Sequence, residues 1–472
     1  MNRGDILIFS SISFLFYFLP IVLILYFAVP FKLKNLVLLL SSLFFYFYGE
    51  PIYGFLMIGT ILSAYIHGLL IGKFKGKAAG KFFLCTSVII PLVSLCFFKY
   101  ADFFISNINI IFGGNFDLLK LALPIGISFY TFQALSYNID VYRNEVAVQK
   151  NLLNLATYIA LFPQLIAGPI VRYADIEAEL RERTHSFENF SYGANRFIIG
   201  LAKKVLIADS LGTLSMLLHD GDASVVGYWV YGVAVSLQLY FDFSGYSDMA
   251  IGLGRIFGFH FLENFNYPFV SKSIGEFWRR WHISLGRWFR DYLYIPLGGN
   301  RVKIPRFIFN TALVWLCTGF WHGADWTFIL WGLYFAIFLV IEKFFLNKVL
   351  KRLPAFLTHF YVCLVVMLSF VLFSSNGLEN AVNDFKCLFG AGDLPLFTSE
   401  TGYYLLSYSV ILVMALVGST PLIKSVVLSL KRREKLNKII NVLEPIIQLS
   451  LLAVITAYMV DGSFSPFLYF RF

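Results

Sequence analysis

Long apolar runs separated by short polar turns most limit what this chain can fold into. A helix needs about 20 apolar residues to cross the hydrocarbon core of a bilayer. The runs stand at 6–29, 36–48, 52–71, 82–98, 121–139, 152–170, 197–208, 226–243, 249–259, 307–320, 326–341, 356–373, 404–417 and 439–460. Several are shorter than about 17 residues, which indicates re-entrant or tilted helices. We therefore expect a polytopic all-α membrane protein with about 10 to 13 crossings.

The composition excludes a water-soluble globular protein. Hydrophobic residues make up 58% of the 472 residues and charged residues only 14%, against about 25% charged in soluble domains. The net charge of +10 suits a membrane protein better than a nucleic-acid-binding one, because nothing else in the composition indicates a soluble basic domain. The five cysteines show no CxxC spacing, so neither a zinc site nor a disulfide framework is expected.

The charges of the short loops predict an orientation, since cytoplasmic loops carry the excess of Lys and Arg. Basic segments at 32–34, 73–81, 343–352 and 424–438 would lie inside, and the acidic segments near Glu50 and at 379–400 would lie outside. This places both the N-terminus and the tail after Val460 on the outer face of the cell membrane. We find no internal repeat and no linker, so we expect one domain over residues 1–472.

The stretch from Lys272 to Arg306 is the most basic part of the chain, with eight basic and two acidic residues. On one continuous helix its aromatic residues would form a stripe, with His282 at the boundary and four arginines opposite: Arg279, Arg280, Arg287 and Arg290. Such a helix could lie at the membrane interface, with its arginines on lipid phosphate. The turn YIPLGGNR that follows favours a second interpretation, in which guanidinium groups bind the phosphates of a cosubstrate such as coenzyme A.

His322 lies in the sequence FWHGADW, between two apolar runs that need every residue to span the bilayer. An ionisable side chain inside lipid is costly and therefore a candidate functional residue, and imidazole is well suited to move a proton near neutral pH. The alternative is a neutral imidazole bonded to a carbonyl group in a helix bundle. For Asp242 and Asp248 a proton relay, a cation site and a helix cap all remain open. We expect the remaining five histidines to be structural (His67, His185, His219, His260 and His359).

Four segments resemble the membrane-bound O-acyltransferase (MBOAT) family, of the alginate O-acetylase type. They are FPQLIAGPIVRY (162–173), YFDFSGYSDMAIGLGRIFGF (240–259), NFNYPFVSKSIGEFWRRWHISLGRWFRDYLYIPLGGNR (264–301) and VWLCTGFWHGADWTFILWGLYF (314–335). Together they cover much of residues 160–340, and the third is the most specific.

The resemblance implies transmembrane, re-entrant and amphipathic helices around a central tunnel. An acyl group from a cytoplasmic thioester, acetyl-CoA above all, would cross this tunnel to a hydroxyl group on the outer face. His322 matches the family's catalytic histidine and would act as general base, worth about 10²–10⁴ in rate. His282 matches its second histidine and would line the passage or orient the acyl carbonyl. Arg279, Arg280, Arg287 and Arg290 would hold the donor's pyrophosphate, and no bound cofactor or metal is implied.

The resemblance also implies an exported polysaccharide such as alginate as acceptor, with an extracytoplasmic acyltransferase as partner protein. The chain ends in PFLYFRF, and similar aromatic tails lead us to expect that Tyr469 relays the acyl group or helps to form the acceptor site. The alternative for Tyr469 is an aromatic anchor at the interface. Two other functions remain open: D-alanyl transfer to teichoic acid, and proton-coupled transport.

Overall fold

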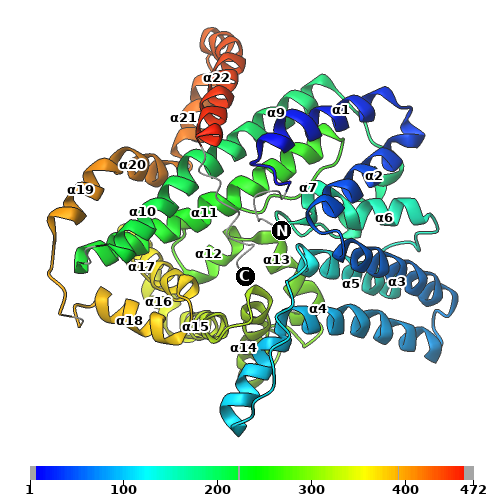
Figure 1. The fold of residues 1–472 in the computed structure, drawn as a ribbon, viewed down its shortest axis with the longest axis horizontal. Helices are drawn as coiled ribbons and strands as arrows, with labels where there is room; N and C mark the ends of the chain where they lie inside the picture. The colour runs from blue at the N-terminus through cyan, green and yellow to red at the C-terminus, as the bar shows by residue number, and fades with distance from the viewer. Residues whose placement is uncertain (1–6, 222–223, 392, 462–472) are drawn as a thin grey trace. The chain divides into compact units, whose positions relative to one another are not determined.

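The computed structural model describes residues 7–221, 224–391 and 393–461, and all regular secondary structure in those ranges is helical (Figure 1). Tyr469 lies outside the described residues. The chain divides into two compact units. Unit 1 contains Met1–Phe197 and Asp248–Leu262, and unit 2 contains Ile198–Ser247 and Glu263–Phe472. The single domain expected from the sequence stays a prediction.

Unit 1 is built around a helix that is buried along nearly its whole length. Its helices are η2 (Phe14–Phe18), α1 (Leu19–Ala28), α2 (Phe31–Gly49), α3 (Tyr53–Lys73), α4 (Ala78–Phe112), α5 (Ile127–Arg143), α6 (Leu152–Ala160), α7 (Phe162–Leu165), α8 (Tyr173–Arg181) and most of α9 (Phe187–Ala202). Helix α5 packs against α3 and α4, and its residues are buried almost without interruption from Ile127 to Val141. Helices α3 and α4 therefore form one side of this unit's core.

Unit 2 contains the rest of the helices. They are η3 (Lys203–Ala208), α10 (Asp209–Asp220), α11 (Val225–Ile256, up to Ser247), η4 (Pro268–Val270), α12 (Ile274–Arg280), α13 (Ile283–Phe289), η5 (Arg290–Tyr294), α14 (Ile304–His322), α15 (Trp326–Ile341), η6 (Glu342–Leu346), α16 (Asn347–Leu350), α17 (Ala355–Ser374), α18 (Leu378–Leu388), α19 (Ser399–Ser407), α20 (Ser409–Gly418), α21 (Leu422–Lys431) and α22 (Glu434–Val460).

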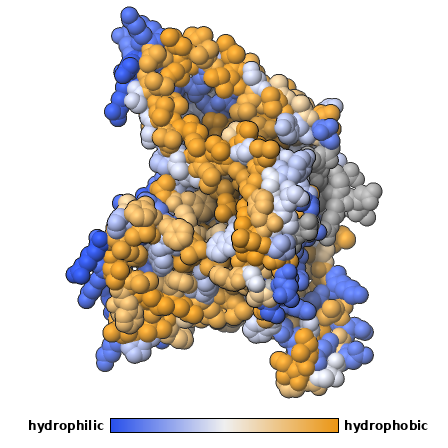
Figure 2. Space-filling model, turned by 90° about the vertical axis from the view of Figure 1, so that its left-hand side faces the viewer, coloured by the Kyte–Doolittle hydropathy of each residue, from blue (hydrophilic) through white to orange (hydrophobic). Residues whose placement is uncertain are grey.

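Six helices in the described ranges are long and apolar enough to cross a membrane, and a bent pair, α19 with α20, would make seven. The chain is therefore a multi-pass membrane protein. The count is below the 10 to 13 expected because several apolar runs form short helices, such as the nine-residue α6. Helix α22 has only 6% of its most apolar window buried, and Figure 2 shows apolar side chains over much of the visible face.

The close approach of α14 and α15 depends on two glycines. A Cβ atom at Gly319 would lie 2.3 Å from the Phe328 carbonyl oxygen, and one at Gly332 would lie 2.3 Å from the Trp315 carbonyl oxygen. Small residues at such positions let helix backbones pack closely in membranes. At the turn between the helices, the Asp325 carboxylate accepts a hydrogen bond from the Thr327 amide at 2.8 Å and caps α15.

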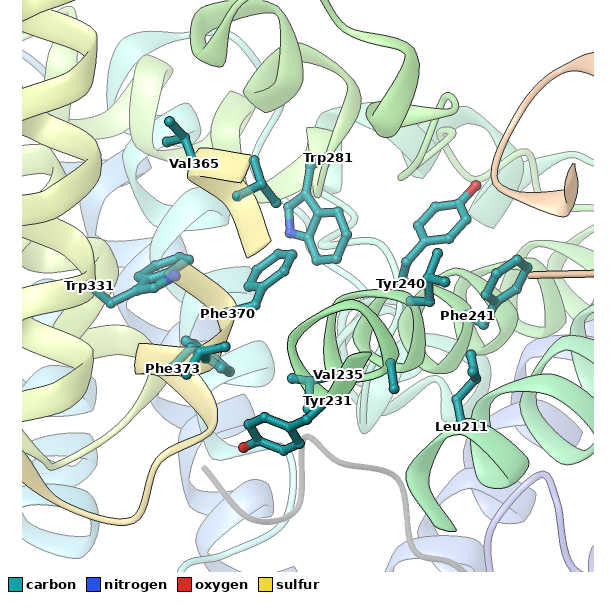
Figure 3. Close-up of a cluster of buried hydrophobic side chains, with 14 of the residues drawn as sticks. Leu211, Tyr231, Val235, Tyr240, Phe241, Trp281, Trp331, Val365, Phe370 and Phe373 are labelled. Carbon is teal, nitrogen blue, oxygen red and sulfur yellow. The ribbon is translucent and has the colours of Figure 1, made fainter. Parts of the chain in front are cut away.

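An aromatic cluster in unit 2 fills the space beside this hairpin. Trp281, Trp331, Phe370 and Phe373 are all buried and belong to one apolar core (Figure 3). The rings of Trp281 and Phe370 lie 5.0 Å apart, and those of Trp331 and Phe373 lie 5.2 Å apart. Trp281, which follows Arg279 and Arg280, is thus held in place by Phe370 of α17.

His219, expected to be structural, joins α10 to α18. Its Nε2 lies 3.1 Å from the buried Asp384 carboxylate, which accepts a second hydrogen bond from Ser375 Oγ at 2.7 Å. Its Nδ1 lies 2.7 Å from Asp220. The hydrogen bond that His219 donates to the Asp384 carboxylate is the main cause that raises the pKa of His219 to about 9. The imidazolium ion therefore holds these elements together at neutral pH.

We predict that this contact weakens in mild base. Because the pKa of His219 is higher in the folded than in the unfolded state, its contribution is complete below about pH 6.5 and is lost as the pH rises through about 9. The Tyr228 and Tyr231 rings that face it titrate above this window. Thermal unfolding in detergent should show a falling midpoint from pH 6.5 to 9, and His219→Gln should flatten that slope. An equal slope in both proteins would contradict the assignment.

We predict that Gly332→Ala lowers the free energy of unfolding by about 1–3 kcal/mol, since the Trp315 carbonyl is backbone and cannot move aside cheaply. Gly59→Ala in α3 is the matched control, because no atom lies within 4 Å of a Cβ there. Apparent melting temperatures in detergent should fall for the first variant and not for the second. A similar melting temperature for Gly332→Ala and the parent protein would refute the packing argument.

Candidate active site

The arginine-rich stretch forms two short helices instead of one. Helix α12 ends at Arg280, Trp281 is extended, and His282 adopts the left-handed conformation with φ 45° and ψ 54° before α13 begins at Ile283. The expectation of one continuous amphipathic helix is therefore wrong. A non-glycine residue in this conformation costs roughly 1–3 kcal/mol and persists only where its surroundings enforce it.

Asn264 enforces the break. Its side-chain oxygen accepts hydrogen bonds from the Ser284 amide at 3.2 Å and from Ser284 Oγ at 2.9 Å. Its backbone carbonyl accepts from the Ile283 amide at 3.0 Å, and its side-chain amide donates to Ser247 Oγ at 3.1 Å. The first amides of α13, which no helical carbonyl can satisfy, are thus bonded to one buried asparagine. The segment that precedes α12 therefore fixes where the helix is interrupted.

The same asparagine sets the tautomer of His282. Its Nδ1 lies 3.1 Å from Asn264 Oδ1, and this oxygen can only accept, because the Ser284 amide already donates to it. Nδ1 therefore carries the proton and Nε2 carries a lone pair. Burial lowers the pKa of His282 to about 3, so the ring is neutral at pH 7. No described residue lies within hydrogen-bonding reach of Nε2.

His282 lines a cavity of ≈ 810 Å³ inside unit 2, which α12, α13, η5, α14, α15 and η6 surround. Its wall is apolar and aromatic near Trp278 and Trp315, whose rings lie 4.6 Å apart. Charged side chains also line it: Arg279, Arg287, Arg290, Glu342 and Lys343. Its size lies within the range of small-molecule and cofactor sites. A neutral imidazole and several cationic side chains therefore line the same cavity.

The four predicted arginines do not share one environment. Arg279, Arg287 and Arg290 line the cavity, whereas Arg280 is not among its lining residues. Arg280 forms an ion pair with Glu276 at 3.0 Å and donates to the Asn266 carbonyl at 3.1 Å. Arg290 is 58% exposed and pairs with Asp291, which marks the solvent end of the cavity.

His322 is the last residue of α14 and is buried among aromatic rings. Its ring lies 5.0 Å from Trp331, 5.3 Å from Phe373 and 5.0 Å from Trp321. The Trp321 ring in turn lies 5.7 Å from that of His282. Both histidines thus contact one indole, although forty residues separate them in sequence. His322 is not among the residues that line the cavity.

Asp242 and Asp248 lie in the middle of α11 and form ion pairs with basic residues of other helices. Asp242 and Asp209 both pair with the buried Lys204 at 2.7 Å, and Asp248 pairs with Arg196 at 2.8 Å. Of the three alternatives open from the sequence, helix capping does not apply.

Sequence reasoning missed three residues of this site: Asn264, Trp278 as a cavity residue, and Glu342. The carboxylate of Glu342 accepts hydrogen bonds from the Ile274 amide at 2.6 Å and from the Gly275 amide at 3.0 Å. It therefore caps the N-terminus of α12, although it follows these residues by 67 and 68 positions in the sequence. The position of Glu342 directly after the apolar run 326–341 was the signal that could have singled it out. Nothing in the sequence links Asn264 to the turn at His282.

Residues 127–378 match the membrane-bound O-acyltransferase (MBOAT) family, a segment that contains both histidines and the cavity. The chain belongs to this family. The resemblance found in the sequence is thus confirmed, and so are the helical membrane fold and the acyltransferase class that it implied.

This O-acyltransferase is similar over most of its length to bacterial proteins that are named as O-acetyl or D-alanyl transferases. “Probable alginate O-acetylase AlgI” of Azotobacter vinelandii is 43% identical over 401 residues, which are 83% of this chain and 79% of that protein. “Peptidoglycan O-acetyltransferase” of Helicobacter pylori is 36% identical over 431 residues, 84% of this chain and 82% of that protein. “Teichoic acid D-alanyltransferase” of Bacillus subtilis is 30% identical over 319 residues, 64% of this chain and 78% of that protein.

We predict that Asn264→Ala destabilises this O-acyltransferase by about 1–3 kcal/mol, because it leaves the buried donors of His282 and Ser284 without their acceptor. Asn264→Asp is the matched control, since it keeps an oxygen at the same place and should retain more of the stability. Thermal unfolding in detergent measures both. If the alanine variant unfolds at the parent temperature, Asn264 does not hold the break.

Proposed function

We propose that this O-acyltransferase takes an acetyl group from cytoplasmic acetyl-CoA and transfers it to a hydroxyl group of an exported cell-surface polysaccharide. The observation that carries the proposal is the cavity, which combines the neutral His282 with arginines in a chain of this family. The names of the alginate and peptidoglycan relatives favour acetyl as the acyl group and a polysaccharide as the acceptor.

Arg279, Arg287 and Arg290 would bind the donor's pyrophosphate. Guanidinium groups bind phosphate oxygens bidentately, and the exposure of Arg290 suits the cytoplasmic entrance. The aromatic wall near Trp278 would then hold the pantetheine arm. Arg280 does not line the cavity and is bonded to a carboxylate and a carbonyl, so we assign it to the structure of α12.

The reaction needs a group that removes the hydroxyl proton, and we assign this role to His322. The hydroxyl oxygen attacks the thioester carbonyl carbon while His322 takes its proton. The C–S bond then breaks, the leaving thiolate takes up the proton held by His322, and the ester and free coenzyme A leave with His322 neutral again. Of the two roles open for His282, lining the passage fits better, because its Nε2 presents a lone pair and cannot donate to a carbonyl oxygen.

The acceptor would reach the site from the outer face, on which the loop charges predict both termini. We propose an extracytoplasmic acyltransferase as the partner that completes the transfer, and Tyr469 as a relay or part of the acceptor site. An acyl ester on Tyr469, detected by intact mass, would support the relay, whereas full transfer by Tyr469→Phe would exclude it.

The second candidate for the transferred group is D-alanyl. It is supported by the similarity to the teichoic acid D-alanyltransferase over 64% of the chain. A deletion strain separates the two functions. Loss of polysaccharide acetyl groups supports the acetyltransferase, and loss of alanine esters from teichoic acid supports D-alanyl transfer.

We predict that His322→Ala lowers transfer from radiolabelled acetyl-CoA in membranes by about 10²–10⁴-fold, because the variant lacks the group proposed to take the hydroxyl proton. His260→Ala is the control, since that histidine is 45% exposed and pairs with Glu179 outside the site. Full transfer by His322→Ala would reject the assignment of the base.

We also predict that Arg287→Ala raises the KM for acetyl-CoA about tenfold, as expected when a phosphate contact worth about 1.4 kcal/mol is lost. Arg280→Ala should change it by less than about twofold. Equal changes in both variants would show that the cavity is not the donor site.

A further inference from the structure

We propose that the indole N–H of Trp278 is the hydrogen-bond donor that binds the thioester carbonyl oxygen during acyl transfer. This proposal rests on the proposed function, and it gives a role in acyl transfer to a residue that the sequence did not single out. The ring lies in the last turns of α12 and lines the same cavity as His282.

The position of the Trp278 ring is fixed by three aromatic neighbours. Trp315 lies 4.6 Å away, Phe335 lies 4.8 Å away and Trp331 lies 5.6 Å away, all at steep angles between ring planes. Such edge-to-face contacts favour one orientation of each ring. The donor is therefore held in place before any substrate binds, which is what stabilisation of developing charge requires.

The Nε1 atom of Trp278 is buried, and no described residue accepts its hydrogen bond. A buried donor without an acceptor costs free energy, so nearly all such groups in folded proteins are paired. At the wall of a cavity that is proposed to hold a thioester, the missing acceptor is readily supplied by the carbonyl oxygen of that thioester.

Trp278 and His282 both line this cavity and carry complementary hydrogen-bonding groups. An indole can only donate, whereas His282 in the tautomer set by Asn264 presents an acceptor. The carbonyl oxygen therefore pairs with Trp278, and not with His282. Negative charge grows on this oxygen as the hydroxyl adds to the carbonyl carbon, and it returns to the carbonyl when the C–S bond breaks. The bond to Trp278 thus strengthens in the transition state.

Trp278→Phe tests the proposal, because it removes the N–H and keeps an aromatic ring against the same neighbours. We expect kcat to fall about 10²–10³-fold, as for other oxyanion donors, with the KM for acetyl-CoA within about twofold. Trp229→Phe is the control for the exchange itself, since Trp229 donates to the Leu388 carbonyl outside the cavity; its kcat should stay within about twofold.

A spectroscopic readout separates donation from packing. The carbonyl stretch of ¹³C-acetyl-CoA should lie at lower frequency when bound to His322→Ala, in which the thioester persists, than when bound to His322→Ala with Trp278→Phe. If Trp278→Phe does not fold, a benzothienylalanine at position 278, which replaces N–H by sulfur in the same shape, is used instead.

Equal carbonyl frequencies, or a parent-like kcat in the variant, would overturn the role of Trp278 while leaving the proposed function intact. Absence of transfer from acetyl-CoA by the parent protein would instead reject the proposed function itself.

Discussion

The site depends on the left-handed backbone at His282 and on the asparagine that holds it. Without this break, α12 and α13 would form one continuous helix. The amides of Ile283 and Ser284 would then donate to carbonyl groups of the preceding turn, and none would remain to donate to Asn264. With the break, one buried side chain supplies an acceptor for the first turn of α13 and for Nδ1 of the imidazole. The same interaction thus fixes both the backbone conformation and the tautomer of His282.

The surroundings of His282 suit chemistry that must exclude water. A ring with a pKa near 3 is neutral throughout the physiological range, so no charge must be stabilised while the cavity is empty. The cations are placed elsewhere on the cavity wall, from Arg279 to the exposed Arg290. A phosphate group can therefore stay near water while its thioester end enters an aromatic environment. The tight pairing of α14 and α15 at Gly319 and Gly332 gives this wall its rigidity.

Much of this could be predicted from the sequence, because membrane helices and family motifs are local signals. Apolar runs gave the class of fold, and the FWRRWH and FWHGADW segments identified both histidines. The break at His282 could not be predicted, since the aromatic stripe is periodic through it. It depends on Asn264, eighteen residues earlier, and on the cap that Glu342 gives α12. The contact that separates Arg280 from the other arginines was, by contrast, predictable, because Glu276 and Arg280 are four residues apart on one helix.

The most direct test of the account is a structure of the protein with a non-reactive ketone analogue of acetyl-CoA, in which a methylene group separates the carbonyl from the sulfur. The account predicts the pyrophosphate beside Arg287 and Arg290, the sulfur near His282, and the carbonyl oxygen within hydrogen-bonding distance of Trp278 Nε1. An analogue bound outside this cavity, or a carbonyl oxygen beyond hydrogen-bonding distance of Trp278 Nε1, would contradict it.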